Sequence, residues 1–324
     1  MIAAVTLCTA AVFVCKGVYM VKNITELLSQ YDGLKLSILW LAPKGTAEGI
    51  LQISHGMSEN KERYLPFMKY MAQRGYVCVI HDHRGHGQSV LDREDLGYMY
   101  GGKNTALVRD LHQVSLWAKE KFPGLPLYLL GHSMGSLIAR NYLKDYDDEI
   151  DKLILTGPPC RNTAAGLGLL IARMEKGICG AHHRSKLLET MSFGMFARRF
   201  RQEESRFAWV CANRQVVEEY EASQDCGFTF TADAYESLML LMKATYSRKG
   251  WKVKHPKLPI LFLAGQEDPC VGNGRKFVQE LQHMKRVGYK KLTGKMYPGM
   301  RHEILNETEK YTVYKNIYEY LKRE

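Results

Sequence analysis

Short apolar runs alternate along this chain with longer segments of helical spacing. Apolar runs of four to eight residues bounded by turn residues are typical of buried strands, whereas apolar residues spaced three or four apart indicate amphipathic helices. This pattern predicts strands at residues 34–41, 49–53, 76–80, 127–130, 153–156, 260–264 and 290–297. It predicts helices at 62–74, 105–122, 136–144 and 307–321. Such alternation indicates an α/β fold with a mostly parallel sheet and helices on both faces.

One long stretch, residues 160–251, interrupts the alternation. It has helical spacing without a clear apolar strand and is rich in Met, Phe and Arg. We interpret it as a mainly helical cap inserted between two strands of the core. Apolar residues at 167–171, 191–196 and 238–242 are candidates for lining a pocket in this cap, although such stripes more often belong to a core.

The N-terminal segment, residues 1–20, is apolar on both sides of Lys16 and allows two interpretations. One is a short membrane anchor, although the segment lacks a positively charged start and barely reaches the ~20 residues of a span. The other is a mis-called start, with translation beginning at Met20. We expect no strand of the sheet before Tyr31 and place the folded domain at 21–324, with membrane contact, if any, through residues 1–21.

Composition narrows the class of protein. The 324 residues are 46% hydrophobic and 24% charged, which is the balance of a globular protein. The formal net charge of +11 comes without basic runs interleaved with aromatics, so it favours a basic surface over nucleic-acid binding. Eight cysteines occur without a CxxC pair, which argues against a zinc ribbon and favours a reducing compartment. We therefore expect a cytoplasmic protein, with membrane anchoring through the N-terminal segment as the alternative.

A nucleophile is indicated by Gly131-His132-Ser133-Met134-Gly135, which matches G-x-S-x-G. The motif follows the predicted strand at 127–130 and opens a predicted helix, and this is the setting of a nucleophile elbow. Glycines two residues on either side of the serine are needed because side chains there would collide with the tight turn. Ser133 is therefore the predicted nucleophile of an α/β-hydrolase fold.

The base and acid should follow the serine in the order acid, then histidine. Asp268 lies in the loop after the predicted strand at 260–264, where catalytic groups gather in such sheets, and Glu267 is its rival. His302 lies in the loop after the last predicted strand and is the only histidine after His283. We predict Asp268 as the acid and His302 as the base.

Two backbone amides should receive the negative charge that develops on the carbonyl oxygen during acyl transfer. Met134, directly after the nucleophile, supplies one. The loop His55-Gly56-Met57 follows an early strand, so we predict the Met57 N–H as the second donor.

Three histidines lie close together in His81-Asp82-His83-Arg84-Gly85-His86 and suggest a metal site. No second ligand cluster completes a coordination shell, and Arg84 places a positive charge in the middle. We therefore predict no metal, and assign Asp82 and Arg84 a supporting role beneath the active site.

Taken together, these motifs resemble the monoacylglycerol lipase and lysophospholipase branch of the α/β-hydrolases, which is grouped with serine-aminopeptidase-like hydrolases. The resemblance is carried by His55-Gly56, Arg63-Tyr64, the segment 82–89, the elbow at 131–135, Asp268 and His302, and it extends from about Tyr31 to the C-terminus. It implies a capped hydrolase without a cofactor that acts on monoacylglycerols, lysophospholipids or short acyl esters. One departure is Ser136, where the family often has another glycine.

Two alternatives remain open. An aminopeptidase would need a carboxylate for the free amine of its substrate, and the cap offers five acidic residues for this purpose: Glu203, Glu204, Glu218, Glu219 and Glu221. A non-catalytic binding protein on the same fold would have no need for the base. A dehalogenase or epoxide hydrolase is excluded, because it requires a carboxylate in place of Ser133.

Overall fold

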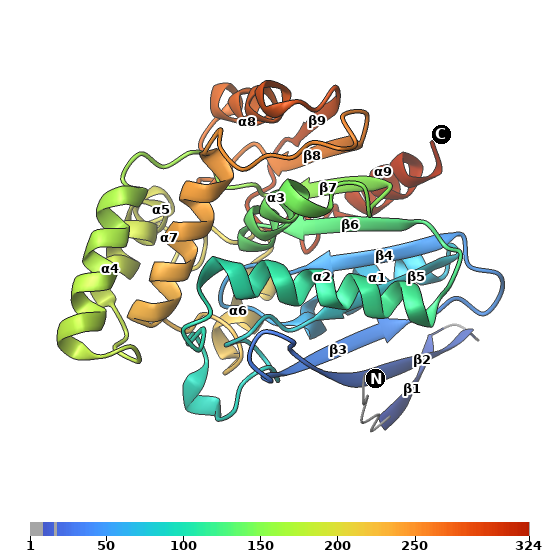
Figure 1. Cartoon of the computed structure of the whole chain (residues 1–324), viewed down its shortest axis with the longest axis horizontal. Helices are drawn as coiled ribbons and strands as arrows, with labels where there is room; N and C mark the ends of the chain where they lie inside the picture. The colour runs from blue at the N-terminus through green and yellow to red at the C-terminus, as the bar shows by residue number, and fades with distance from the viewer. Residues whose placement is uncertain (1–8, 16–17, 324) are drawn as a thin grey trace.

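The computed structural model describes residues 9–15 and 18–323, and in these ranges nine strands form one sheet (Figure 1). The strands are β1 (Thr9–Cys15), β2 (Val18–Leu28), β3 (Lys35–Leu41), β4 (Gly49–Ser54), β5 (Tyr76–His81), β6 (Leu127–His132), β7 (Lys152–Thr156), β8 (Pro259–Gly265) and β9 (Lys291–Tyr297). Their order is β1-β2-β3-β5-β4-β6-β7-β8-β9. Pairing is antiparallel from β1 to β5 and parallel from β5 to β9. The predicted mostly parallel sheet is confirmed.

Helices cover both faces of the sheet, and each face has its own apolar core. On one face lie α2 (Lys103–Lys121), α3 (Met134–Tyr146) and α8 (Gly274–Val287), and on the other α1 (Leu65–Ala72) and α9 (Lys310–Lys322). Short 3-10 helices span Lys61–Tyr64 and Arg93–Asp95. The four predicted helices all occur, with shifted ends, whereas α8 was missed.

Between β7 and β8 the chain forms α4 (Ala165–Cys179), α5 (Lys186–Arg199), α6 (Arg214–Ala222) and α7 (Ala232–Tyr246). The described residues of this stretch, called the cap below, contain no strand. The cap lies over the edge at which the parallel strands end (Figure 1). Hydrogen bonds anchor it to the loop after β4. The Gly227 N–H and the Tyr220 hydroxyl both donate to the Ser58 carbonyl, at 2.9 and 2.8 Å, and Ser58 Oγ donates to the Phe228 carbonyl at 2.8 Å.

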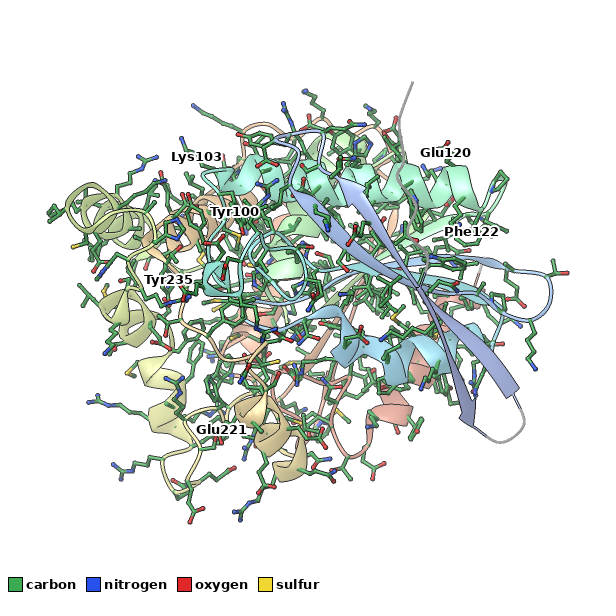
Figure 2. All side chains as sticks on the ribbon, turned by 90° about the horizontal axis from the view of Figure 1, so that it is seen from below. Tyr100, Lys103, Glu120, Phe122, Glu221 and Tyr235 are labelled. Carbon is green, nitrogen blue, oxygen red and sulfur yellow. The ribbon has the colours of Figure 1, made fainter. Side chains whose placement is uncertain are left out.

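The expectation that no strand precedes Tyr31 is wrong. Six residues of β2, from Asn23 to Leu28, pair with β3. Because β1 (Thr9–Cys15) pairs with β2 in turn, the sheet begins before the predicted domain start at residue 21. Figure 2 shows the β1–β2 ribbon in the foreground, away from Tyr235 of the cap. Residues 1–20 are apolar enough to match a membrane anchor as well as a strand, so their composition did not predict the strand that continues to Leu28. Of the predicted anchor, residues 1–8 and 16–17 lie outside the described residues.

Across the described ranges, no helix is both long enough and apolar enough to cross a membrane.

Candidate active site

Ser133 occupies a strained turn between β6 and α3. Its φ of 50° and ψ of −116° are rare for a residue with a side chain. Its N–H donates to the Thr156 carbonyl at 3.0 Å, which fixes the turn against β7. A Cβ on Gly131 would lie 2.6 Å from the Gly135 carbonyl, and one on Gly135 would collide with the Ser54 carbonyl. The two motif glycines are thus sterically required for the turn.

His302 connects Ser133 to Asp268. Its Nε2 lies 2.8 Å from Ser133 Oγ, and its Nδ1 lies 2.9 Å from Asp268 Oδ2. The other Asp268 oxygen accepts the Cys270 N–H at 2.8 Å. His302 and Asp268 are both buried. Three residues separated by up to 169 positions in the sequence therefore form one continuous hydrogen-bonded chain.

Glu267, the rival acid, points away from this chain. Its side chain is 46% exposed and lies 3.9 Å from Arg301 Nε. Only Asp268 of the two adjacent carboxylates contacts His302.

Electrostatics within the site act on His302 in opposite directions. Burial is the largest single influence and lowers the pKa of His302, but the adjacent Asp268 carboxylate and Cys270 together outweigh it, so the pKa of His302 is raised well above 6.5. The neighbouring His132 differs, because burial, reinforced by the charge of His302, lowers its pKa to about 4. His132 is therefore neutral at pH 7, with its Nδ1 3.1 Å from Thr156 Oγ1.

Met57 and Met134, the two predicted oxyanion donors, line the same cavity as Ser133. Met134 is the first residue of α3, where an amide has no acceptor within its own helix. Gly56 packs closely between Glu59 and Ser133, since a Cβ on Gly56 would lie 2.7 Å from Glu59 Oε1 and 3.3 Å from Ser133 Cβ. A glycine is required at this position for the loop to approach the nucleophile.

The predicted histidine cluster is a buried packing unit. His81, His83 and His86 pack in one group with His55, with ring centroids 4.3–6.4 Å apart. The His83 N–H donates to His55 Nε2 at 2.9 Å, and the Ser58 N–H donates to His86 Nε2 at 3.2 Å. These bonds hold the loop that carries Gly56 and Met57.

Asp82 and Arg84 lie behind this cluster and away from the cavity lining. Asp82 accepts the N–H groups of Lys61 and Gln88 at 2.8 and 2.9 Å. Arg84 is bound to Asp110 at 2.8 Å and to Asp32 at 2.7 Å. Any support they give to the site is indirect, through the loops they fix.

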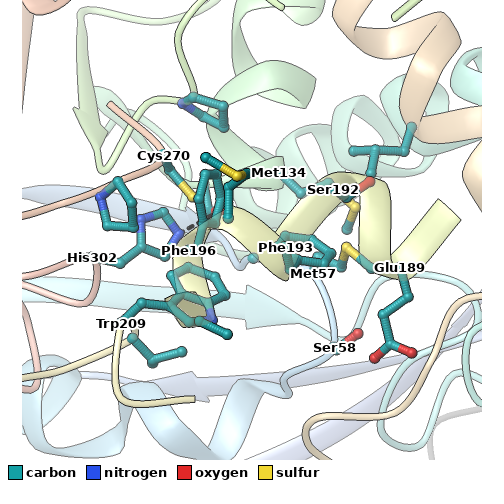
Figure 3. A pocket seen from close by; sticks show the side chains of 18 of the residues that line it. Met57, Ser58, Met134, Glu189, Ser192, Phe193, Phe196, Trp209, Cys270 and His302 are labelled. Carbon is teal, nitrogen blue, oxygen red and sulfur yellow. Dashed lines mark hydrogen bonds between the residues drawn. The ribbon is translucent and has the colours of Figure 1, made fainter. Parts of the chain in front are cut away.

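A cavity of about 780 Å³ opens beside Ser133 and His302, between the cap and the sheet (Figure 3). Its wall is mainly apolar and aromatic, with contributions from Met57, Phe193, Phe196, Phe207, Trp209, Leu238 and Met242. Two of the three predicted apolar segments, 191–196 and 238–242, contribute to it. The segment 167–171 does not: Leu167 and Leu170 are exposed, and Leu169 packs into the core.

Three residues next to His302 were not predicted from the sequence: Trp209, Gly157 and Cys270. The Trp209 ring centroid lies 5.3 Å from that of His302. A Cβ on Gly157 would lie only 3.0 Å from His302 Nδ1. Cys270 Sγ lies with ligand atoms of Asp268 and His302 within 4.8 Å, which is a spacing that could hold a metal ion. Because Asp268 and His302 bond to each other at 2.9 Å, the present geometry suits a proton between them better than an ion.

The sequence profile of a known family, described as serine aminopeptidase S33, matches residues 45–309. The chain belongs to the serine aminopeptidase S33 family. The structure of a carboxyl esterase from Bacillus coagulans aligns with a TM-score of 0.86 at 23% identity, over 93% of this chain and 97% of the other. This S33 member therefore has the α/β-hydrolase fold, as predicted.

Curated relatives include two lipases. Monoglyceride lipase of Homo sapiens is 35% identical over 108 residues, which is 33% of this chain and 34% of that protein. Monoacylglycerol lipase of Mycolicibacterium smegmatis is 25% identical over 284 residues, which is 85% of this chain and 88% of that protein. The match to the human enzyme thus spans only about a third of its length, whereas the bacterial match is nearly complete but more distant.

Proposed function

We propose that this protein is a carboxylic ester hydrolase that works through an acyl-enzyme on Ser133. The observation that carries the proposal is the hydrogen-bonded chain from Ser133 through His302 to Asp268, located at the wall of an apolar cavity. A serine without a catalytic role would need neither a buried histidine as its base nor a carboxylate that fixes this histidine.

In the proposed cycle, His302 Nε2 takes the proton from Ser133 Oγ as this oxygen attacks the ester carbonyl. The Met57 and Met134 amides donate to the resulting oxyanion. His302 then protonates the departing alcohol, and water releases the acid by the same route. Throughout, Asp268 holds His302 Nδ1 protonated, so that Nε2 faces the serine.

The apolar cavity wall favours a fatty acyl chain over a charged peptide. We therefore propose monoacylglycerols, lysophospholipids or short acyl esters as substrates. The names of the two lipases described above are in line with the first of these. The alternative of an amide-cleaving aminopeptidase has less support. Of the lining carboxylates, Glu59 and Glu303 already bind Arg63, and Glu189 accepts a hydrogen bond from Thr229. None of the five cap acids proposed earlier lines the described cavity.

A substrate panel tests the proposal. The wild-type protein is assayed on p-nitrophenyl esters of increasing chain length and on aminoacyl-nitroanilides, beside Ser133→Ala and the matched control Ser192→Ala. Ser192 lines the same cavity without contacting His302. We expect ester cleavage that Ser133→Ala abolishes and Ser192→Ala leaves within threefold. Faster cleavage of nitroanilides, or Ser133→Ala activity within tenfold of wild type, would contradict the proposal.

A further inference from the structure

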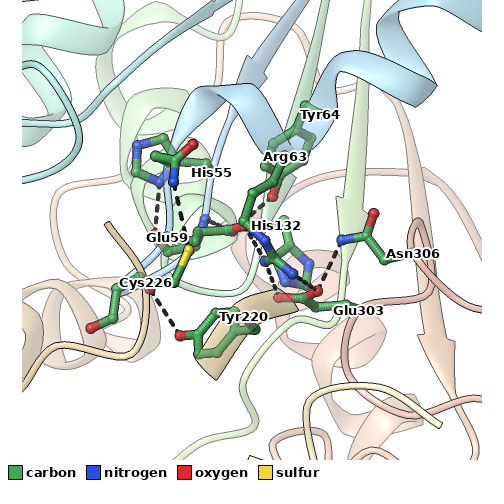
Figure 4. A network of polar contacts seen from close by, with 12 residues as sticks. His55, Glu59, Arg63, Tyr64, His132, Tyr220, Cys226, Glu303 and Asn306 are labelled. Atoms are coloured by element: carbon green, nitrogen blue, oxygen red, sulfur yellow. Dashed lines mark hydrogen bonds and ion pairs between the residues drawn. The ribbon is translucent and has the colours of Figure 1, made fainter. Parts of the chain in front are cut away.

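A buried cluster of three charged side chains joins the two loops that flank the nucleophile (Figure 4). Arg63 Nη1 lies 3.0 Å from Glu59 Oε2 and also bonds Glu303 Oε1, while Nη2 lies 2.6 Å from Glu303 Oε2. The side chains of Glu59, Arg63 and Glu303 are 3%, 14% and 6% exposed. A single guanidinium therefore binds two carboxylates from distant parts of the chain.

Glu59 fixes the loop that carries Met57. Its Oε1 accepts the Gly56 N–H at 2.5 Å and the Tyr64 hydroxyl at 2.9 Å. The Gly56 carbonyl is held from the other side by His55 Nδ1, at 2.8 Å. Both polar groups of Gly56 are thus bound, and the peptide that presents the Met57 N–H has a set orientation.

Glu303 fixes the loop that carries the base, because it directly follows His302. Its N–H donates to the Val210 carbonyl at 2.8 Å, and its carboxylate is bound by Arg63 and by Asn306 Nδ2 at 2.9 Å. Main chain and side chain are both fixed next to His302. The position of the imidazole consequently depends on where Arg63 holds Glu303.

We propose that Arg63 is a positioning residue that sets the placement of the Met57 amide relative to His302, an inference that rests on the proposed function. Burying an ion cluster carries a desolvation cost, so apolar residues of similar volume often stabilise a fold equally well. The planar guanidinium offers donors to both carboxylates at once, with two parallel bonds to Glu303, whereas an ammonium cannot reproduce this fork. The cluster thus fixes the geometry of the active site, and the stability of the fold alone would not require it.

Arg63→Lys tests the inference because it keeps the charge and removes the fork. A misplacement of about 1 Å at an active site can cost ~10² in rate, so we expect kcat to fall by roughly 10- to 100-fold. Arg63 is not among the residues that line the described cavity, so KM should stay within about threefold. Arg140→Lys is the matched control, since Arg140 is also buried and binds a buried carboxylate, Glu280, at 2.6 Å.

A second readout separates positioning from general loss of stability. An oxygen ester is compared with its thionoester, whose sulfur accepts hydrogen bonds weakly and therefore gains little from a well-aligned oxyanion hole. In the wild type the oxygen ester should react much faster. Arg63→Lys should reduce this ratio of rates by about tenfold. Arg140→Lys should leave the ratio unchanged, even when its Tm is equal to or lower than that of Arg63→Lys. Glu303→Gln, nearly the same shape, should shrink the ratio in the same direction and serves if Arg63→Lys does not fold.

An unchanged ratio in Arg63→Lys, or in Glu303→Gln should the former not fold, would overturn the inference. So would a decrease in kcat that matches the one in Arg140→Lys. Failure of the proposed function looks different, because the wild type itself would then cleave neither ester.

Discussion

At the scale of single residues, the adjacent acids Glu267 and Asp268 lie in different surroundings, and only Asp268 bonds His302. Asp268→Asn removes the charge that stabilises the imidazolium and favours the wrong tautomer, and the same change costs on the order of 10⁴ in rate in a well-studied protease. We expect a loss of that order in kcat. Glu267→Gln, half-exposed beside Arg301, should change kcat by less than about threefold. If Glu267→Gln is the more damaging change, the acid has been misassigned.

The protonation of His302 gives a prediction on pH. Because Asp268 and Cys270 together outweigh burial and raise the pKa of His302 well above 6.5, the imidazolium persists to higher pH than in a free histidine. Only the neutral ring can take the proton of Ser133, so kcat/KM should rise with pH along a limb whose midpoint lies above 6.5. A pH profile with a non-ionising ester measures this. A midpoint at or below 6.5 would mean that Asp268 and Cys270 do not outweigh the burial of the base.

At the scale of elements, the sequence predicted more of the active site than of the sheet's edge. Ser133 and Asp268 each follow a strand with a clear apolar run, and His302 follows the less apolar last strand as the only histidine after His283, so all three could be predicted. The fork of Arg63 could not be predicted, because it depends on Glu59 and Glu303, which are 244 residues apart and meet only after folding. Helix α8 was readable but overlooked, since Phe277, Leu281, Met284 and Val287 have helical spacing.

The edge strands allow a comparison of two truncations. A protein starting at Met20 loses β1 but keeps every pair between β2 and β3, from Asn23 to Leu28. It should fold and retain full activity. A protein starting at Tyr31 loses these pairs, buried Leu27 and the 2.5 Å bond from Ser29 to Asp110. We expect its Tm to fall by roughly 5 °C or more and its exposed β3 edge to promote aggregation.

Thermal melting and size-exclusion chromatography of both truncations against the full chain check this prediction. Equal Tm values for the Tyr31 and Met20 starts would show that β2 adds nothing to the sheet's stability.

At the scale of the whole molecule, buried histidines make stability depend on pH. Burial lowers the pKa of His55 and His132 to about 4 and of His81 and His86 to about 3. In the unfolded chain these groups titrate near 6.5, so the unfolded state binds more protons as pH falls. Their neutral burial is therefore without penalty above about pH 6.5 and increasingly unfavourable from there toward pH 4.

Urea unfolding at pH 7.5, 6.0 and 5.0 should show the midpoint falling at each step, with more than one proton taken up per molecule unfolded at pH 5.0. His302 acts in the opposite direction, because its raised pKa favours folding at acid pH. It is one group against six, since burial also lowers the pKa of His83 and His283. A midpoint that is constant from pH 7.5 to 5.0 would contradict the neutral burial of the cluster.

Covalent labelling with a fluorophosphonate, located by peptide mass spectrometry, tests whether Ser133 is a nucleophile activated by His302. The wild type should carry one adduct, on Ser133. Ser133→Ala should carry none, and His302→Ala should label slower by orders of magnitude, because the hydroxyl then lacks its base. Ser58 and Ser192 line the same cavity and serve as internal controls. An adduct on either of them instead of Ser133, or a labelling rate that does not depend on His302, would show that Ser133 is not a nucleophile activated by His302.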